Sequence, residues 1–185
     1  MINYYLPKSA VINGTEYDIR SDYRAILDIC IALSDPQLSD QERAYVALNI
    51  FYPDWEDIPP DDLEEALKYV MWFIDCGEEH DTKTKQPRLV DWEQDFTKII
   101  TPVNKVAGHD VRGDDYMHWW TFIGLYSEID SECMFSQIVQ IRAKKAKGKK
   151  LEKHEQEFYN QHRDMIDLKQ KYTSAEEEWI RALTE

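Results

Sequence analysis

The amino-acid sequence predicts a mainly α-helical fold, a helical bundle of about six or seven helices with a small N-terminal β-hairpin. Apolar residues recur at helical spacing in successive segments, and the dipeptide Asn13-Gly14 stands between two short apolar stretches. The chain has 185 residues, which suits a domain with a real core, and its 12% aromatic content argues against disorder. We expect one domain over residues 1–150. A C-terminal helical segment over residues 151–185 should pack on that domain or on a partner.

The hairpin and the first helix are predicted from local signals. Residues 11–19 should form the hairpin, because Asn-Gly tolerates the positive φ angles of a tight turn. A hairpin alone is marginally stable, so it must pack on the helices. A helix is predicted over residues 22–33, with Ile26 on its apolar face and Ser21 or Asp22 as its cap.

Two further helices have recognisable starts. Ser39 and Glu42 form a capping-box pattern for a helix over residues 41–52. Two prolines and two aspartates at residues 59–62 open the next helix, and Gly77 is expected to end it. Its predicted apolar stripe consists of Leu63, Leu67, Val70, Met71 and Ile74.

The middle of the chain begins with a predicted exposed loop over residues 78–88, which are polar and lack periodicity. Asp91 then caps a helix through Ile100. Pro102 should bend or end this helix near Thr101, because proline lacks the backbone N–H. The remaining predicted elements are a turn at residues 108–113 and two helices at residues 114–128 and 132–147.

An aromatic cluster at residues 116–122 is the most distinctive stretch of the sequence. Trp119 and Trp120 point about 100° apart on a helix, so we do not expect them to share one contact. The cluster could be a recognition patch for a protein partner. A core helix filled with aromatic side chains is the favoured interpretation, since large rings of this kind are usually buried.

The C-terminal segment repeats an apolar residue every seven positions. A second seam is weaker, because it contains His154 and Gln161, so the pattern is half of a coiled coil. It predicts a long helix laid on one partner surface, although Ser174 with Glu177 could start a separate short helix. The repeated residues are Leu151, Phe158, Met165, Tyr172 and Trp179.

The charge is strongly negative but unevenly distributed. The formal charge of −14 argues against a general nucleic-acid binder, because phosphate contacts need a positive surface. Residues 142–153 nevertheless carry a net +6, which makes them a basic island. We interpret this island as a solvated connection near a helix C-terminus. It could equally dock on an acidic patch of a neighbouring copy, so a homo-oligomer is an open alternative.

The sequence offers no recognisable catalytic chemistry, and we expect neither an enzyme nor a cofactor. Cys76 and His80 could face one metal ion, but Gly77 between them should end the helix. His154 begins a stretch like a metalloprotease helix, but Phe158 stands where the second histidine is required. No glycine-rich phosphate loop or nucleophile motif is present, and no metal site is expected.

Few cysteines and the absence of export signals indicate an intracellular protein. Cys30, Cys76 and Cys133 are odd in number and widely spaced, which fits a reducing compartment. The N-terminus lacks the layout of a signal peptide, and no apolar run is long enough to span a bilayer. We therefore expect no membrane partner.

Several of these segments together carry a resemblance to a known family. They are the hairpin, Asp91-Trp92-Glu93-Gln94-Asp95, Trp119-Trp120-x-Phe122-x-x-Leu125, Ile138-x-x-Ile141-Arg142, and the lysine stretch running into Glu157-Phe158-Tyr159. In these features the chain resembles the bacteriophage "Gp-fifteen" family, found in tail-gene clusters of phages and prophages of Gram-positive bacteria. The resemblance covers most of the chain.

The resemblance implies a small, mostly helical protein of the host bacterial cytoplasm, made while the phage tail is built. By analogy with tail-assembly chaperones encoded near the tape-measure gene, it would hold the tape-measure protein before the tail polymerises. The resemblance supplies no catalytic residues. An alternative is a structural virion component, such as a connector or tail-completion protein. An acidic inhibitor that mimics DNA is a further alternative, against which the basic island argues.

A tape-measure protein is a very long helical chain whose apolar seams are exposed before assembly. A helper protein therefore needs apolar helices to cover those seams and net charge to keep the complex soluble. The C-terminal stripe could instead pack on the chain's own body. The residues predicted to bind the partner are Phe158, Met165, Tyr172 and Trp179, together with Trp120 from the aromatic cluster.

Overall fold

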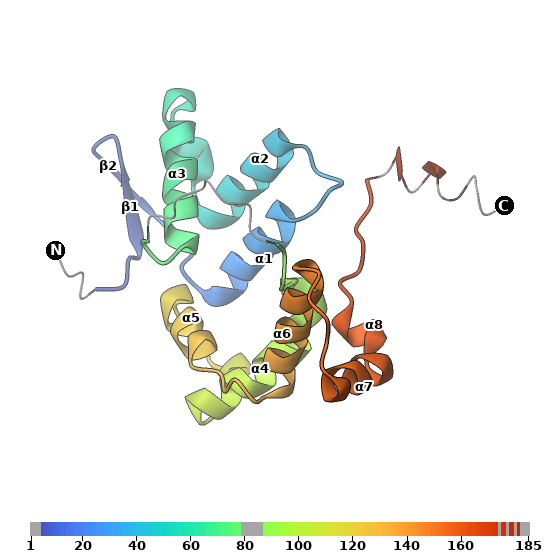
Figure 1. The fold of residues 1–185 in the computed structure, drawn as a ribbon. Coiled ribbons are helices and arrows are strands. Elements are labelled where there is room, and N and C mark those ends of the chain that lie inside the picture. Colours follow the sequence, from blue (N-terminus) through green and yellow to red (C-terminus); the bar gives the residue numbers. More distant parts are fainter. Residues whose placement is uncertain (1–4, 79–86, 174, 177, 180, 182–185) are drawn as a thin grey trace. The chain divides into compact units, whose positions relative to one another are not determined.

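The computed structural model describes residues 5–78, 87–173, 175–176, 178–179 and 181. Within these ranges the chain forms eight α-helices, three short 3₁₀ segments and one antiparallel hairpin (Figure 1). The predicted fold class, a helical protein with a small N-terminal hairpin, is confirmed. Contacts divide the chain into two compact units. The first contains the described residues up to 78, Tyr116–Phe122 and the described residues from Gln170 onward; the second contains residues 87–115 and Ile123–Lys169.

The hairpin at the start of the first unit forms as predicted. Strands β1 (Ser9–Ile12) and β2 (Thr15–Asp18) are antiparallel, and their turn places Asn13 at φ 46° and Gly14 at φ 88°. Both angles are positive, as a type I′ turn requires, which explains why Asn-Gly stands there. Ala10 and Ile12 are buried, while Val11 between them is 64% exposed.

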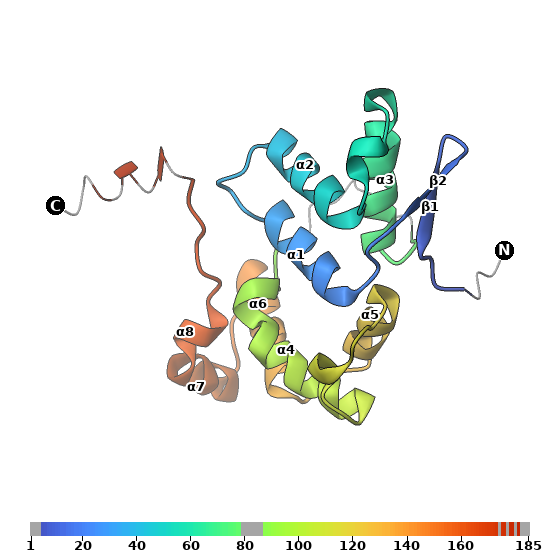
Figure 2. The ribbon, with the colours of Figure 1, turned by 180° about the vertical axis from the view of Figure 1, so that it is seen from behind.

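The first unit continues with helices whose caps agree with the sequence. Helix α1 (Tyr23–Leu33) begins at Asp22, whose side chain accepts from the N–H of Arg24, and α2 (Asp40–Phe51) has the predicted capping box. A 3₁₀ turn leads into α3 (Leu63–Ile74). Both views show α1 beside α2 and the hairpin beside α3 (Figure 1 and Figure 2).

The predicted apolar stripe of α3 needs correction. The buried residues are Ala66, Val70 and Phe73, whereas Met71 is 42% exposed. Val70 belongs to the predicted stripe, and Leu63, Leu67 and Ile74 are partly buried, so the error is the inclusion of Met71 in place of Ala66 and Phe73. The chain reverses after the helix through Cys76 at φ 56° and Gly77 at φ 81°. Gly77 therefore marks the stop, although α3 itself ends at Ile74.

Helix α4 (Trp92–Ala107) opens the second unit with Asp91 as its cap, as predicted. The expected end near Thr101 is wrong, because α4 continues through Pro102 to Ala107. Val103, directly after the proline, is fully buried, and its packing offsets the hydrogen bond that proline removes. Gly108, at φ 78°, then ends the helix, and a 3₁₀ turn follows at Val111–Gly113.

Helix α5 (Trp119–Ser127) is shorter than predicted at its N-terminal end, and the boundary between the units falls within it. Residues before it are extended, because His118 forms an antiparallel bridge with Asp22. Helix α6 (Met134–Ala146) follows, capped by the side chain of Cys133.

The C-terminal segment is not one long helix, so that prediction is wrong. It forms α7 (Lys153–Gln161), then the short α8 (Arg163–Ile166), then a stretch without regular structure from Asp167 to Thr173, and the described residues 175–176, 178–179 and 181 are helical. Residues 151–169 belong to the second unit, so the predicted boundary at residue 150 does not coincide with a boundary between units. The alternative of a separate short helix after Tyr172 agrees with these helical residues, although Ser174 and Glu177 themselves lie outside the described residues. The capping pattern seen there joins Thr173 to Glu176: the N–H of Thr173 donates to the Glu176 carboxylate at 2.8 Å, and the N–H of Glu176 donates to the Thr173 hydroxyl at 3.3 Å. None of the helices seen in the described ranges combines the length and apolar character needed to cross a membrane.

Candidate protein-binding groove

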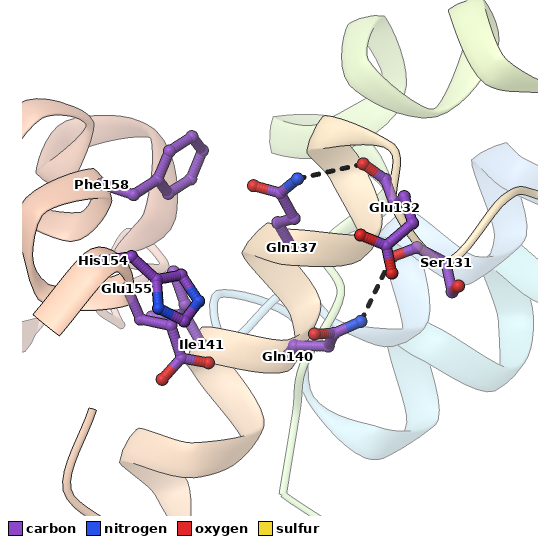
Figure 3. A pocket seen from close by; sticks show the side chains of 8 residues that line it. All are labelled: Ser131, Glu132, Gln137, Gln140, Ile141, His154, Glu155 and Phe158. Carbon is purple, nitrogen blue, oxygen red and sulfur yellow. Dashed lines mark hydrogen bonds between the residues drawn. The ribbon is translucent and has the colours of Figure 1, made fainter. Parts of the chain in front are cut away.

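A groove lies between α6 and α7 in the second unit. It encloses about 280 Å³ and is open on one side. Figure 3 shows His154 and Phe158 of α7 facing Gln137 and Gln140 of α6, with the segment before α6 along the far edge. Its lining residues are Ser131, Glu132, Gln137, Gln140, Ile141, His154, Glu155 and Phe158.

Two glutamines fix one wall of this groove. The side-chain amide of Gln137 donates to the carbonyl of Glu132 at 3.0 Å, and that of Gln140 donates to the carbonyl of Ser131 at 3.2 Å (Figure 3). The hydroxyl of Ser136 also donates to the carbonyl of Asp130 at 2.9 Å. These bonds satisfy loop carbonyls that would otherwise need water, so the wall is held in place without a bound partner.

The opposite wall is fastened by the basic island. Lys144 Nζ lies 2.5 Å from a carboxylate oxygen of Glu155, and this hydrogen bond is the main reason that the pKa of Glu155 is lowered. Lys145 contacts Asp167, donates to the hydroxyl of Tyr159 at 2.6 Å and lies over that ring. The interpretation of the island as a purely solvated connection is therefore wrong for these two lysines, which tie α6 to the segments after it.

The groove lining is mostly polar, and its two apolar residues, Ile141 and Phe158, belong to or pack against a neighbouring core. Ile138, Ile141 and Ile166 make a small buried core, and Phe158 and Met165 pack against it. Phe158 therefore has two roles in the geometry: it covers this core and it lines the groove. Packing on the chain's own body, the alternative weighed for the predicted stripe, is what the structure shows for Phe158 and Met165.

The other predicted partner-binding residues lie elsewhere. Tyr172 is half-buried and Trp179 is 66% exposed; both belong to the first unit, as does the half-buried Trp120. The five residues therefore do not form one surface within a unit. Their part in binding stays a prediction.

A buried ion pair joins α6 to α4 in the same unit. The guanidinium of Arg142 donates to both carboxylate oxygens of Asp95, at 2.5 and 3.0 Å, and their side chains are 5% and 0% exposed. The same guanidinium donates to the carbonyls of Ile166 at 2.6 Å, Met165 at 3.2 Å and Leu89 at 2.9 Å. One side chain thus joins α4, α6, the end of α8 and the segment before α4. We call this set the arginine clamp.

The arginine clamp also explains why α8 is short. The carbonyls of Met165 and Ile166 belong to its last turn and have no partner within a helix that ends there. Arg142 supplies that partner, and Gln94 adds a donor to the carbonyl of Asp167 at 3.0 Å. Gln94 also accepts from the N–H of Lys169 at 2.9 Å. The segment after α8 is therefore held through its backbone.

The aromatic cluster belongs to the core of the first unit, as the favoured interpretation predicted. Trp119 is 2% exposed and Phe122 is fully buried. The two tryptophans do not share one hydrogen-bond acceptor, as expected, but both bond the end of α3. The indole N–H of Trp119 donates to the carbonyl of Ile74 and that of Trp120 to the carbonyl of Phe73, both at 2.9 Å.

The sequence did not reveal the polar residues that build this region. Arg142 and Asp95 lie in two separate segments of the family resemblance, 47 positions apart, and no residue near either one indicated that they pair. An arginine directly after two isoleucines at helical spacing was the available signal, because arginine is rarely buried unless it is paired. Gln137 and Gln140 resemble any solvated helix face in sequence. Among the described residues, no group of three or more His, Cys, Asp or Glu could hold a metal ion. His80, of the candidate pair with Cys76, lies outside those residues.

Comparison with known proteins gives one match. The model of a family described as Bacteriophage Gp15 protein matches residues 2–168, which is nearly the whole chain. No curated protein and no solved structure matches the chain.

Proposed function

Because the chain belongs to the Bacteriophage Gp15 protein family, we propose that it is a non-catalytic assembly factor that binds the phage tape-measure protein before the tail polymerises. The family indicates a phage structural or assembly role. Our proposal adds three parts to this role: the tape-measure protein as the partner, action as a chaperone, and the host cytoplasm as the place of action.

The preformed groove between α6 and α7 is the observation that carries the proposal. Binding grooves that are already ordered lose little conformational entropy when they take a partner, so affinity is not spent on ordering the site. Two glutamines and Lys144 hold the walls, and Phe158 is an apolar side chain in a lining that is otherwise mostly polar. A long helical partner with exposed apolar residues fits such a groove.

Net charge supports the same role. A formal charge of −14 keeps a complex with an apolar helical chain in solution through repulsion between copies. A protein that stays in the finished particle has less need of this property. The exposed Trp179, at 66% exposure, offers a second apolar contact for a partner.

Co-expression with the tape-measure protein of the same genome tests the proposal. We expect affinity capture to recover a soluble complex with several copies of this chain per tape-measure chain, as measured by light scattering or native mass spectrometry. Purified virions should lack the protein. Stoichiometric protein in virions, with no tape-measure complex, would contradict the proposal and indicate a virion component instead.

A further inference from the structure

We propose that the outer edge of β2 binds an extended segment of another protein, rich in lysine or arginine, as a third strand of the hairpin. This edge belongs to the first unit, whereas the α6–α7 groove belongs to the second. The inference therefore does not depend on the proposed function, and a synthetic peptide can test it.

Every second residue of β2 directs its backbone groups away from β1. The N–H of Ile19 donates to the carbonyl of Lys8 at 3.2 Å, and the register continues from there to the turn. Hydrogen-bonded and non-bonded positions alternate in an antiparallel pair, so Glu16 and Asp18 occupy non-bonded positions. Among the described residues, the N–H and C=O groups of these two have no hydrogen-bond partner. The outer edge of β2 is therefore free to pair with another strand.

The chain itself begins to pair along this edge and then turns away. Arg20 is the next residue in the same row, and its N–H donates to the carbonyl of Phe51 at 2.8 Å. Beyond that contact, side chains from residues 52–57 line the far side of a groove of about 500 Å³, which we call the β2-edge groove. This side of the strand thus accommodates a backbone acceptor at Arg20, and Glu16 and Asp18 lack one. The groove is lined by Thr15, Glu16, Tyr17, Asp18, Tyr52, Asp54 and Asp57.

The free edge selects an extended segment. A helix pairs its own N–H and C=O groups internally, so it would leave those of Glu16 and Asp18 without a partner. An added strand pairs with them and satisfies its own inward-facing backbone groups at the same time. Strand β2 has four residues and is about 14 Å long at ~3.4 Å per residue, so a partner segment of about four residues spans it.

Charge selects a basic segment. Asp18, Asp54 and Asp57 are exposed, and among the described residues their carboxylates form no ion pair. The guanidinium of Arg20 is directed elsewhere, because it donates to the carbonyls of residues 49 and 50 at 2.8 and 2.7 Å. Opposite charges on facing strand positions stabilise a sheet and like charges destabilise it. A second copy of β2 would set Glu16 and Asp18 against the same carboxylates, so a basic partner fits where self-pairing does not.

The two faces of the added strand meet different surroundings. Glu16 and Asp18 project to one face of the hairpin, where the basic side chains of the partner would lie beside them. Tyr17 projects to the other face, and its ring centroid lies 6.3 Å from that of Tyr52. Branched side chains pack well beside aromatic rings on a sheet, so valine, isoleucine or threonine should alternate with the basic residues.

The probe is a short peptide in which two lysines alternate with two valines, labelled for fluorescence anisotropy with the full-length protein. Replacing both lysines by glutamate should weaken binding by at least about tenfold. Methylation of backbone nitrogens tests strand pairing directly, because in an antiparallel pair a lysine opposite Glu16 directs its N–H toward β2 and a valine directs its N–H away. Methylated lysine nitrogens should therefore abolish binding, and methylated valine nitrogens should leave it within about twofold.

Substitutions at Asp18 separate the backbone contribution from the charge. Asp18→Ala removes the carboxylate alone, whereas Asp18→Pro also removes the N–H, which the hairpin does not use. We expect Asp18→Pro to bind the lysine peptide about three- to tenfold more weakly than Asp18→Ala, because it lacks one hydrogen bond. Asp164→Ala removes the same charge from an exposed residue of the second unit and should leave binding unchanged. Circular dichroism checks that each variant is folded.

Three outcomes would overturn the inference. If both methylated peptides bind alike, the edge does not pair with the peptide. If folded Asp18→Pro binds as tightly as Asp18→Ala, the N–H at the edge is not used. A concentration-dependent doubling of mass that Asp18→Pro removes would mean that a second copy occupies the edge. The methylated peptides are measured on the wild type, so they decide the question even where Asp18→Pro fails to fold.

Discussion

The two units of the molecule bury their polar and aromatic groups in different ways. In the first unit rings pack on rings: Tyr23 stacks on Phe122 with centroids 4.5 Å apart, and two indoles donate to the end of α3. In the second unit the buried ion pair of Arg142 with Asp95 lies beside a small cluster of isoleucines. Apolar packing stabilises without fixing one arrangement, whereas a buried charged group requires its partners at defined positions. In the second unit a buried ion pair therefore adds defined polar contacts to an apolar core.

The largest expected effect comes from breaking the arginine clamp. Arg142→Met leaves the Asp95 carboxylate buried beside Lys98 at 3.9 Å and removes the donors of three carbonyls. We expect a loss of about 3–5 kcal/mol in the free energy of unfolding, measured by urea denaturation. Lys147→Met is the matched control, since this exposed side chain at the end of α6 should matter by less than about 0.5 kcal/mol.

Hydrogen exchange sharpens that test. In Arg142→Met, amides of residues 87–115 and 123–169 should exchange faster, while those of the first unit keep their protection. Equal loss of protection in both units would show that the comparison between them is wrong.

A smaller effect is expected at the end of α3 in the first unit. Gly77 has φ 81°, and a Cβ built there would lie 3.1 Å from the Trp72 ring and 3.2 Å from the Trp120 ring. Gly77→Ala should therefore cost about 1–3 kcal/mol, measured as above. Gly124→Ala is the control of opposite sign: it lies within α5 with open space around it, so it should stabilise by up to about 1 kcal/mol. A neutral Gly77→Ala would mean that the aromatic packing around this turn is loose.

Trp120→Phe should have a still smaller effect. It keeps a ring against Phe73 but removes the indole N–H that donates to the Phe73 carbonyl, at a cost of about 1–2 kcal/mol. Trp120 is also one of the residues predicted to bind a partner. If the variant unfolds as readily as the wild type yet no longer captures the tape-measure protein, its main role is binding and not packing.

The smallest effects concern pH, and they have opposite signs in the two units. Burial lowers the pKa of His118 below its usual 6.5; its Nδ1 accepts from the N–H of Trp120, and its Nε2 bonds the carbonyl of Pro7. The folded state prefers the neutral ring, so the stability that His118 contributes is complete above pH 6.5 and declines as pH falls below it. The exposed His109 differs, because its hydrogen bond to Asp114 raises its pKa. Its contribution is complete below pH 6.5 and is lost as pH rises through the raised pKa.

Unfolding curves between pH 8 and pH 5 test both histidines. His118→Gln should make the loss of stability below pH 6.5 less steep, and His109→Gln should remove a gain in stability that appears as pH falls toward 6.5. The same change of slope in both variants would contradict the assignment of opposite signs.

Features set by neighbours in sequence were predictable, and features set by distant residues were not. The Asn13-Gly14 turn and the caps at Asp22, Ser39 and Asp91 follow from residues within a few positions of one another. Residues before α5 carry a helical pattern, yet they are extended because Met117 and His118 pair with residues 21–23. No local signal could have shown this, since the two segments are about a hundred positions apart.

The candidate site shows the same division. Phe158 was identified because apolar residues recur every seven positions, and the structure places it at the groove. The repeat did not continue as one helix: α7 ends at Gln161, and the short α8, whose last carbonyls accept from Arg142, ends at Ile166. The walls depend on Gln137 and Gln140, whose function follows only from where the preceding loop lies.

The insertion of residues 116–122 into the first unit has a consequence for synthesis on the ribosome. Phe122 stacks on Tyr23 and Trp119 bonds the end of α3, so the core around them cannot close until translation has passed residue 122. At roughly 5–20 residues per second, several seconds separate the emergence of α3 from that moment. During this interval the nascent chain exposes the apolar surface of Phe73 and Tyr23. The order of synthesis thus delays closure of this core until residues 116–122 have been made.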